Sequence, residues 1–185
     1  MKTQAAKTYK YIAFLRAINV GGRTVKMDAL KQLFVDMGCF HIITYIQSGN
    51  LIFDTTEKNA AVLTKKIETY LLAQLGYEVI TVLKQPAELA SIINQHPFLD
   101  INNETHTQYV MLLNTMPNAA QINSVMEKST DIDTYKIIGD VVHIRCHKAP
   151  GIKNLFSNMA LEKLMKIGGT TRNWNTMNKL LALAQ

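Results

Sequence analysis

The amino-acid sequence predicts an α+β fold built from two successive β-α-β-β-α-β halves. The first observation concerns the apolar residues of segment 8–83. Stretches with the apolar pattern of a β-strand and stretches with the apolar pattern of a helix succeed one another there in a definite order. The second is a similar order of patterns after residue 106. The third is a pair of hairpin turns, Gly49-Asn50 and Gly139-Asp140, in matching places between two helices. The order of elements therefore indicates an internal structural duplication.

The first half begins with an apolar run, TYKYIAFLR, whose β-forming side chains predict a strand. Met27, Leu30 and Phe34 then recur at helical spacing before a stop at Gly38. Thr56 is expected to cap the second helix. The elements expected in order are a strand at 8–16, a helix at 27–38, a hairpin at 41–54, a helix at 56–76 and a strand at 77–83. This is the order of the ferredoxin-like split β-α-β unit, in which an antiparallel sheet carries its helices on one face.

The second half repeats this pattern after a short helix at 86–94. The elements expected in order are a strand at 107–114, a helix near 118–127, a hairpin at 134–146, a helix at about 153–166, the extended piece GGTTR and a final helix. We therefore predict a first ferredoxin-like half at 1–95 and a second ferredoxin-like half, with the C-terminal helix, at 96–185. The segment HPFLDINNETHT at 96–107 is the expected boundary.

The composition limits the classes of function. With 48% hydrophobic and 18% charged residues in a chain of 185, a globular protein is expected. The apolar runs are too short and interrupted to span a bilayer, and the first residues lack the apolar region of a secretory signal. We therefore expect a cytoplasmic protein without membrane association, as a monomer or homodimer.

The sequence shows no motif for a metal or a cofactor, and none is expected. CxxC, HExxH, Walker and dinucleotide patterns do not occur. Cys39 and Cys146 are expected to be packed thiols, because two cysteines make no disulfide framework in a reducing compartment. His143 and Arg145 alternate with Cys146 along an expected strand, which predicts a solvent-facing His143 and an inward Cys146.

The charge is concentrated near the end of the chain. Residues 1–142 contain 13 Lys and Arg against 13 Asp and Glu, whereas residues 143–185 contain 7 Lys and Arg and one acid, Glu162. The formal net charge of +6 thus lies in the last 43 residues. Such an asymmetry is typical of a protein with an anionic partner, and also of a solvated pair of terminal helices.

The loop after the first strand contains the first candidate binding residues: Arg16, Asn19, Gly21, Gly22 and Arg23. A glycine pair at a strand-to-helix turn lets backbone N–H groups point at a ligand oxygen, and the positive end of the next helix favours an anion. Arg23 and Lys26 stand beside that helix start, where a cation is disfavoured. The loop therefore predicts an anion site, or a tight turn in which Arg16 pairs with a carboxylate.

The tip of the first hairpin contains the second group, Gln47, Ser48 and Asn50. Their amide and hydroxyl groups recognise ligands rather than react with them, and Gly49-Asn50 is also ordinary turn chemistry that supplies positive φ angles. Gln47 alternates with Tyr45 on one strand face, so its side chain is expected to face a ligand bound on that face of the sheet.

The third group, Arg172, Asn173 and Asn175, surrounds Trp174 at the start of the last helix. Trp174 falls on the apolar stripe of that helix, which predicts a core anchor. Asn173, or Thr171 before it, is a natural N-cap, whereas Arg172 is a second cation beside a helix start. A negatively charged ligand, or a buried carboxylate, between the two helix starts accounts for both anomalies.

Three segments, RAINVGGRTVKM (16–27), TYIQSGNLIF (44–53) and TTRNWNTMNKL (170–180), together resemble the bacterial domain of unknown function 1697 family. The resemblance covers nearly the whole chain, although the family's first motif typically reads RGINVGG and this chain has Ala17 at the second position. It implies a bacterial, cytosolic protein of ferredoxin-like α+β build. It implies no established activity.

These observations predict a protein that binds an anionic, phosphate-containing small molecule or a nucleic-acid backbone through one conjoined polar cluster. Single-stranded nucleic acid is one expected partner, because antiparallel sheets of this kind present tyrosines on which bases stack. An enzyme acting on a phosphorylated or carboxylated metabolite is the first alternative, for which the sequence offers no general base. A structural or regulatory interaction module is the second.

Overall fold

The computed structural model describes residues 6–16, 18–19, 21–98, 104–148, 151 and 156–185. Contacts divide the chain into two compact units. Unit 1 runs to Glu88 and includes Leu180–Gln185, and unit 2 is Leu89–Lys179. The division thus falls within two helices, α3 (Pro86–Asn94) and α6 (Trp174–Ala184). The domain boundary at residues 95 and 96 stays a prediction, and residues 99–103 of the expected boundary segment lie outside the described residues.

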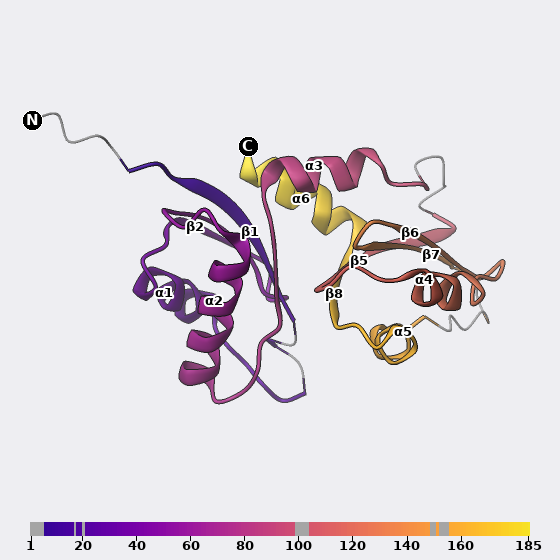
Figure 1. Cartoon of the computed structure of the whole chain (residues 1–185), viewed down its shortest axis with the longest axis horizontal. Helices are drawn as coiled ribbons and strands as arrows, with labels where there is room; N and C mark the ends of the chain where they lie inside the picture. The colour runs from indigo at the N-terminus through magenta and orange to yellow at the C-terminus, as the bar shows by residue number, and fades with distance from the viewer. Residues whose placement is uncertain (1–5, 17, 20, 99–103, 149–150, 152–155) are drawn as a thin grey trace, which may run out of the picture. The chain divides into compact units, whose positions relative to one another are not determined.

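Unit 1 contains one antiparallel sheet of four strands with two helices on one face. Its elements are β1 (Tyr9–Leu15), α1 (Met27–Asp36), β2 (Phe40–Tyr45), β3 (Asn50–Thr55), α2 (Ala60–Leu75) and β4 (Thr81–Lys84). The strand order is β2-β3-β1-β4, and each neighbouring pair is antiparallel. Figure 1 shows α1 and α2 side by side against this sheet. The central strand β1 therefore has a neighbour on each edge.

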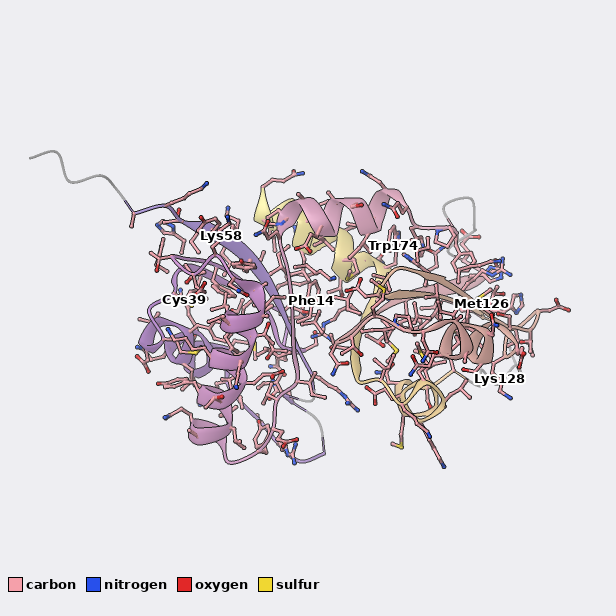
Figure 2. The ribbon with its side chains drawn as sticks, in the orientation of Figure 1. Phe14, Cys39, Lys58, Met126, Lys128 and Trp174 are labelled. Carbon is pink, nitrogen blue, oxygen red and sulfur yellow. The ribbon has the colours of Figure 1, made fainter. Side chains whose placement is uncertain are left out.

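The core of unit 1 lies between the sheet and these two helices. Leu30 and Phe34 of α1, with Leu63, Ile67 and Leu71 of α2, are buried against the sheet. The facing residues of β1 are Tyr11, Ala13 and Leu15. The alternate β1 residues Ile12 and Phe14 (Figure 2) are also fully buried. Both faces of β1 are thus covered, which explains why this strand is a continuous apolar run.

Unit 2 repeats the arrangement. Its elements are β5 (His106–Leu113), α4 (Ala119–Met126), β6 (Asp133–Ile138), β7 (Val141–His147), α5 (Asn158–Met165) and β8 (Gly169–Asn173). The strand order is β6-β7-β5-β8, again antiparallel throughout. Val125 of α4 and Leu161 and Met165 of α5 pack with Met111 and Ile144 of the sheet. Figure 1 shows α4 and α5 on the same side of this sheet. The predicted α+β class with two β-α-β-β-α-β halves is confirmed.

Each unit has an equivalent pair of backbone hydrogen bonds at the end of its central strand. In unit 1, Leu15 N donates to Gly49 O at 2.8 Å, and Arg16 N donates to Ile80 O at 2.8 Å. These bonds tie the end of β1 to the residues that precede β3 and β4. The corresponding pairs in unit 2 are Leu113 N to Asp140 O at 2.9 Å and Asn114 N to Gly168 O at 3.0 Å. The duplication is therefore visible in individual backbone bonds as well as in strand order.

A glutamate on the second helix of each unit fixes the start of the last strand. Glu68 Oε1 of α2 accepts a hydrogen bond from Thr81 N at 2.8 Å. Glu162 Oε1 of α5 accepts one from Gly169 N at 3.0 Å.

Because β4 begins only at Thr81, the strand predicted at 77–83 is shorter than expected at its start. Residues 77–80 instead form a connecting segment.

Other local predictions were partly wrong at helix starts. The N-cap of α2 is Asn59, not Thr56, and its side chain accepts from Ala61 N and Val62 N. The predicted stop at Gly76 is confirmed, because Gly76 adopts φ 76° as the C-cap. α5 begins at Asn158 with Ser157 as its cap, and the expected start at Lys153 lies outside the described residues. The extended piece GGTTR is confirmed from Gly169 onward, because β8 is Gly169–Asn173.

We expect Asn59→Ala to lower the free energy of unfolding of unit 1 by about 1 kcal/mol, because two N–H groups of α2 lose their acceptor. Thr56→Ala is the matched control, since Thr56 is exposed and lies outside the helix. Urea denaturation of both variants measures the difference. Equal losses in the two variants would contradict the assignment of Asn59 as the cap.

Candidate functional site

The first two candidate segments meet in unit 1, where Asn19 joins the loop after β1 to the tip of the first hairpin. Asn19 Nδ2 donates to Gln47 O at 2.7 Å and to Val25 O at 3.2 Å. Asn19 Oδ1 accepts from Val25 N at 2.5 Å. The side chain of Asn19 is thus engaged with the backbone on both sides of it. Its observed role is to position the loop.

Three glycines shape this region. Gly21 and Gly22 have φ angles of 65° and 83°, a conformation that glycine adopts without steric cost. Gly49 has φ 74°, and a Cβ atom there would lie 2.6 Å from Ile18 Cγ2 and 3.0 Å from Leu15 Cβ. The hairpin tip therefore packs directly on the end of β1. A side chain at residue 49 would push the two apart.

The polar residues of the hairpin tip differ in their surroundings. Gln47 is exposed and lies in the turn after β2, so the expectation that it alternates with Tyr45 on a strand face is wrong. The positive φ angles occur at Ile46 and Gly49, not at Asn50. Asn50 is fully buried, and its Nδ2 donates to Tyr45 O at 3.1 Å and to Ser48 Oγ at 2.8 Å. Asn50 and Ser48 therefore hold the turn.

Arg16 and Arg23 line one pocket of about 380 Å³ in unit 1, together with Glu78 and Ile80. Arg16 directly follows β1 and is half-buried, and its backbone N–H is the group that donates to Ile80 O. Arg23 is exposed, and its guanidinium carbon lies 4.2 Å from the centre of the Tyr77 ring. A cation held over an aromatic face is attracted by the ring quadrupole. Both arginines are thus anchored beside the segment 77–80.

Tyr77 is itself held in place. Its hydroxyl donates to Ile18 O at 3.3 Å, and its ring packs against the core of unit 1. Glu78, the next residue, is exposed and lines the arginine pocket. Glu78 is not among the residues predicted for the site, because no local pattern separates it from other surface glutamates. Only the tertiary pairing of residues 77–80 with the end of β1 brings it to the pocket.

The third candidate segment lies in unit 2. Arg172 belongs to β8, where it is 7% exposed, and its guanidinium donates to Thr170 Oγ1 at 2.6 Å and to Thr171 O at 2.8 Å. Burial lowers the pKa of Arg172 to about 10. Asn173 Oδ1 accepts from Asn175 N at 2.8 Å, which confirms Asn173 as the cap of α6. A site shared with the first two segments stays a prediction.

A buried histidine cluster in unit 2 was missed by sequence reasoning. His143 was expected to face solvent, but it is 1% exposed, and its Nδ1 lies 2.7 Å from Nδ1 of His96. His96 Nε2 lies 2.8 Å from Gln108 Oε1, and Gln108 Nε2 donates to Phe98 O. The prediction failed because both faces of β7 are covered, so alternation does not identify a solvated face.

The hydrogen bonds of this cluster fix its protons. Because Gln108 Nε2 donates to a carbonyl, Gln108 Oε1 faces His96 and accepts from its Nε2–H. In neutral His96 the Nδ1 atom then accepts from His143 Nδ1–H. Trp174 (Figure 2) stacks on the His96 ring with centroids 3.8 Å apart. Trp174 is half-buried, so it covers the cluster rather than serving as a fully buried core anchor.

We expect the free energy of unfolding to fall as the pH drops below about 6.5. Burial, and then the charge of His96, lower the pKa of His143 to about 4, whereas an unfolded histidine titrates near 6.5. Between these values the unfolded chain binds a proton that the folded chain excludes. The loss should reach about 1.4 kcal/mol per pH unit for this residue.

Urea denaturation of the wild type between pH 7.5 and pH 5 measures this loss. His143→Gln should have lower stability at pH 7.5 but a smaller loss on acidification. His41→Gln is the comparison variant. The His41 side chain is 78% exposed, and the variant removes its contact from Nδ1 to Asp54 Oδ2 at 2.8 Å, so the loss on acidification should be no smaller than in the wild type. A dependence that is unchanged in His143→Gln would contradict the assignment.

Both cysteines are free and buried, as predicted. Burial raises the pKa of Cys39 (Figure 2) to about 11. Burial and the neighbouring Asp133 raise the pKa of Cys146 as well. Neither thiol is therefore poised as a thiolate nucleophile. Within the described residues, no three His, Cys, Asp or Glu side chains gather as metal ligands would, and no helix is long and apolar enough to cross a membrane.

Comparison with known proteins identifies a family and a related fold. The family model described as "Protein of unknown function (DUF1697)" matches residues 9–143, which includes the first two of the three segments noted in the sequence. A solved structure of a conserved bacterial protein from Streptococcus pneumoniae aligns with a TM-score of 0.71 at 20% identity, covering 97% of this chain and 100% of that one. It is similar in fold. No curated protein matches the chain.

Proposed function

The chain belongs to the DUF1697 family of proteins of unknown function, and from its own geometry we propose that it binds a phosphate-containing small molecule between Arg16 and Arg23 in unit 1. The observation that carries this proposal is that two guanidinium groups from one loop line a single pocket of about 380 Å³. That volume falls in the range of small-molecule sites. The proposal includes a cytoplasmic location.

The chemistry of the pocket suits a phosphate group. A guanidinium offers N–H donors in a planar fork that matches two phosphate oxygens, and hydrogen bonds between ionised partners are the strong ones. The Arg23 side chain is braced by the Tyr77 ring, whereas for Arg16 it is the backbone N–H that is tied to Ile80 O. Side chains that are already held in place lose less entropy when a ligand binds.

A comparison of the two units supports the assignment of this pocket to unit 1. Eleven residues, 16–26, connect β1 to α1, whereas five residues, 114–118, connect β5 to α4. Four residues, 77–80, separate the cap of α2 from β4, whereas two separate the cap of α5 from β8. The same framework thus carries longer connections in unit 1, and the residues that line the pocket lie in them. Fold stability alone does not require these additions, because unit 2 folds in the same way without them.

The proposal is tested by calorimetric titration of propyl phosphate into wild type, Arg23→Gln and Arg23→Lys. We expect Arg23→Gln to weaken binding roughly tenfold to a hundredfold, because hydrogen bonds to charged groups contribute about 1.5–3 kcal/mol. Arg23→Lys should retain part of the affinity, since it keeps the charge and loses the fork. Lys31→Gln, at an exposed position of α1 outside the arginine pocket, is the matched control for net charge.

Two results would count against the pocket. One is the absence of binding by the wild type at millimolar propyl phosphate. The other is an equal loss of affinity in Arg23→Gln and Lys31→Gln, which would indicate only a general attraction of anions to a basic protein. A labelled single-stranded oligonucleotide tests the nucleic-acid alternative, for which affinity should fall with salt at a logarithmic slope of about −0.7 per phosphate contacted. Oligonucleotide binding that survives Arg23→Gln, without propyl phosphate binding, would replace the small-molecule proposal.

A further inference from the structure

The arginine pocket continues into a second depression of unit 1. This depression has a volume of about 300 Å³ and is lined by Glu68, Thr69, Leu72, Glu78, Val79 and Ile80. Glu78 and Ile80 belong to both hollows. The two hollows therefore adjoin along the connecting segment 77–80, and together they are called the groove. Its charge is divided, with Arg16 and Arg23 at one end, Glu68 at the other and Glu78 between them.

We propose that this groove selects a zwitterionic ligand, whose phosphate group lies at Arg16 and Arg23 and whose ammonium group lies at Glu78. This inference rests on the proposed phosphate site and adds the class of ligand. The expected ligand is a small phosphorylated amine in which a short apolar spacer separates the two charges.

Glu78 is the reason that a simple anion fits this groove poorly. Its exposed carboxylate lines the same pocket as the two guanidinium groups, so a ligand with only negative charge meets a like charge beside its own binding partners. Specificity is commonly built from such a repulsive element together with the attractive ones. An ammonium group on the ligand turns this repulsion into an ion pair.

Glu68 has a different part in the groove. One of its carboxylate oxygens accepts from Thr81 N, which holds the start of β4. Glu68 therefore adds negative charge to its end of the groove while its position is set by the fold. Glu78 follows Tyr77, whose ring supports Arg23. The residue proposed to bind the ammonium group, Glu78, and the one proposed to bind the phosphate group, Arg23, are therefore positioned by the same short segment.

The apolar residues of the groove fit the spacer. Ile80 is half-buried and is shared by the two hollows, and Leu72 is 44% exposed beside Glu68 in the second hollow. Methylene groups of a ligand can cover this apolar surface. A phosphorylated amine with a short apolar spacer therefore matches the arginines, Glu78 and the apolar surface of the groove.

The test compares two ligands that share a phosphate group and a chain of similar length. Phosphoethanolamine ends in an ammonium group, whereas propyl phosphate ends in a methyl group. We expect the wild type to bind phosphoethanolamine roughly threefold to fivefold more tightly, the range of an exposed ion pair. Glu78→Gln should lose this preference, chiefly by binding propyl phosphate more tightly than the wild type does.

Asp131→Asn is the matched control, because it removes one exposed negative charge from unit 2 and should leave the preference unchanged. Thermal melts of all variants confirm folding, which is expected because Glu78 is exposed. Equal affinity of the wild type for the two ligands overturns the zwitterion inference and leaves the phosphate site standing. A preference that persists in Glu78→Gln also overturns it. Failure of both ligands to bind, by contrast, overturns the proposed function itself.

Discussion

The hydrogen bond from Arg16 N to Ile80 O is the contact on which the proposed site depends, because it ties the end of β1 to the segment before β4. Tyr77 and Glu78 precede Ile80 and are held beside the same strand end. Tyr77 then supports Arg23 through its ring. The Arg23 side chain is thus placed by a packed aromatic ring, and the backbone of Arg16 is placed by a hydrogen bond of unit 1. Such support keeps side chains in one arrangement before a ligand arrives.

The opposite edge of β1 is constrained as firmly. Leu15 N donates to Gly49 O, and the lack of a side chain at Gly49 allows the hairpin tip to pack on Leu15 and Ile18. Asn19 then holds the following loop to Gln47. The loop that carries Arg23 is therefore fixed at its base by the central strand and the hairpin. Long loops on such a scaffold tolerate change in their sequence, and binding residues are common in them.

The sequence could predict the fold because its signals are local and consistent with one another. The run at 8–16, the helical spacing from Met27 and the turns at Gly49 and Gly139 each follow from patterns of a few residues. The order of these elements then limits the topology. Their recurrence in a second half indicated the duplication, which the shared strand order confirms.

The site was harder to predict because its parts come together only through tertiary structure. Arg16 and Arg23 stood out as cations next to glycines, but Glu78 has no local signal and depends on the bond at Ile80. His143 was misassigned because strand alternation assumes one solvated face, and in unit 2 both faces of β7 are buried. The cap of α2 was misplaced because Thr56 and Asn59 are both suitable residue types, and only the course of the chain selects Asn59.

The histidine cluster and Arg172 of unit 2 differ in exposure from Arg23 and Glu78 of the unit 1 groove. In unit 2, His96, His143 and Gln108 are buried and make their hydrogen bonds with one another or with the backbone, and Arg172 donates to oxygens of its own strand. Removing such groups from water is costly unless each finds a partner, so they specify one packing arrangement and are closed to a ligand. In unit 1, Arg23 and Glu78 remain exposed at the rim of a groove while the segments that carry them are fixed. A charge that stays accessible on a rigid support can exchange water for a ligand without rearranging the core, and this difference is the physical reason for assigning the binding function to unit 1.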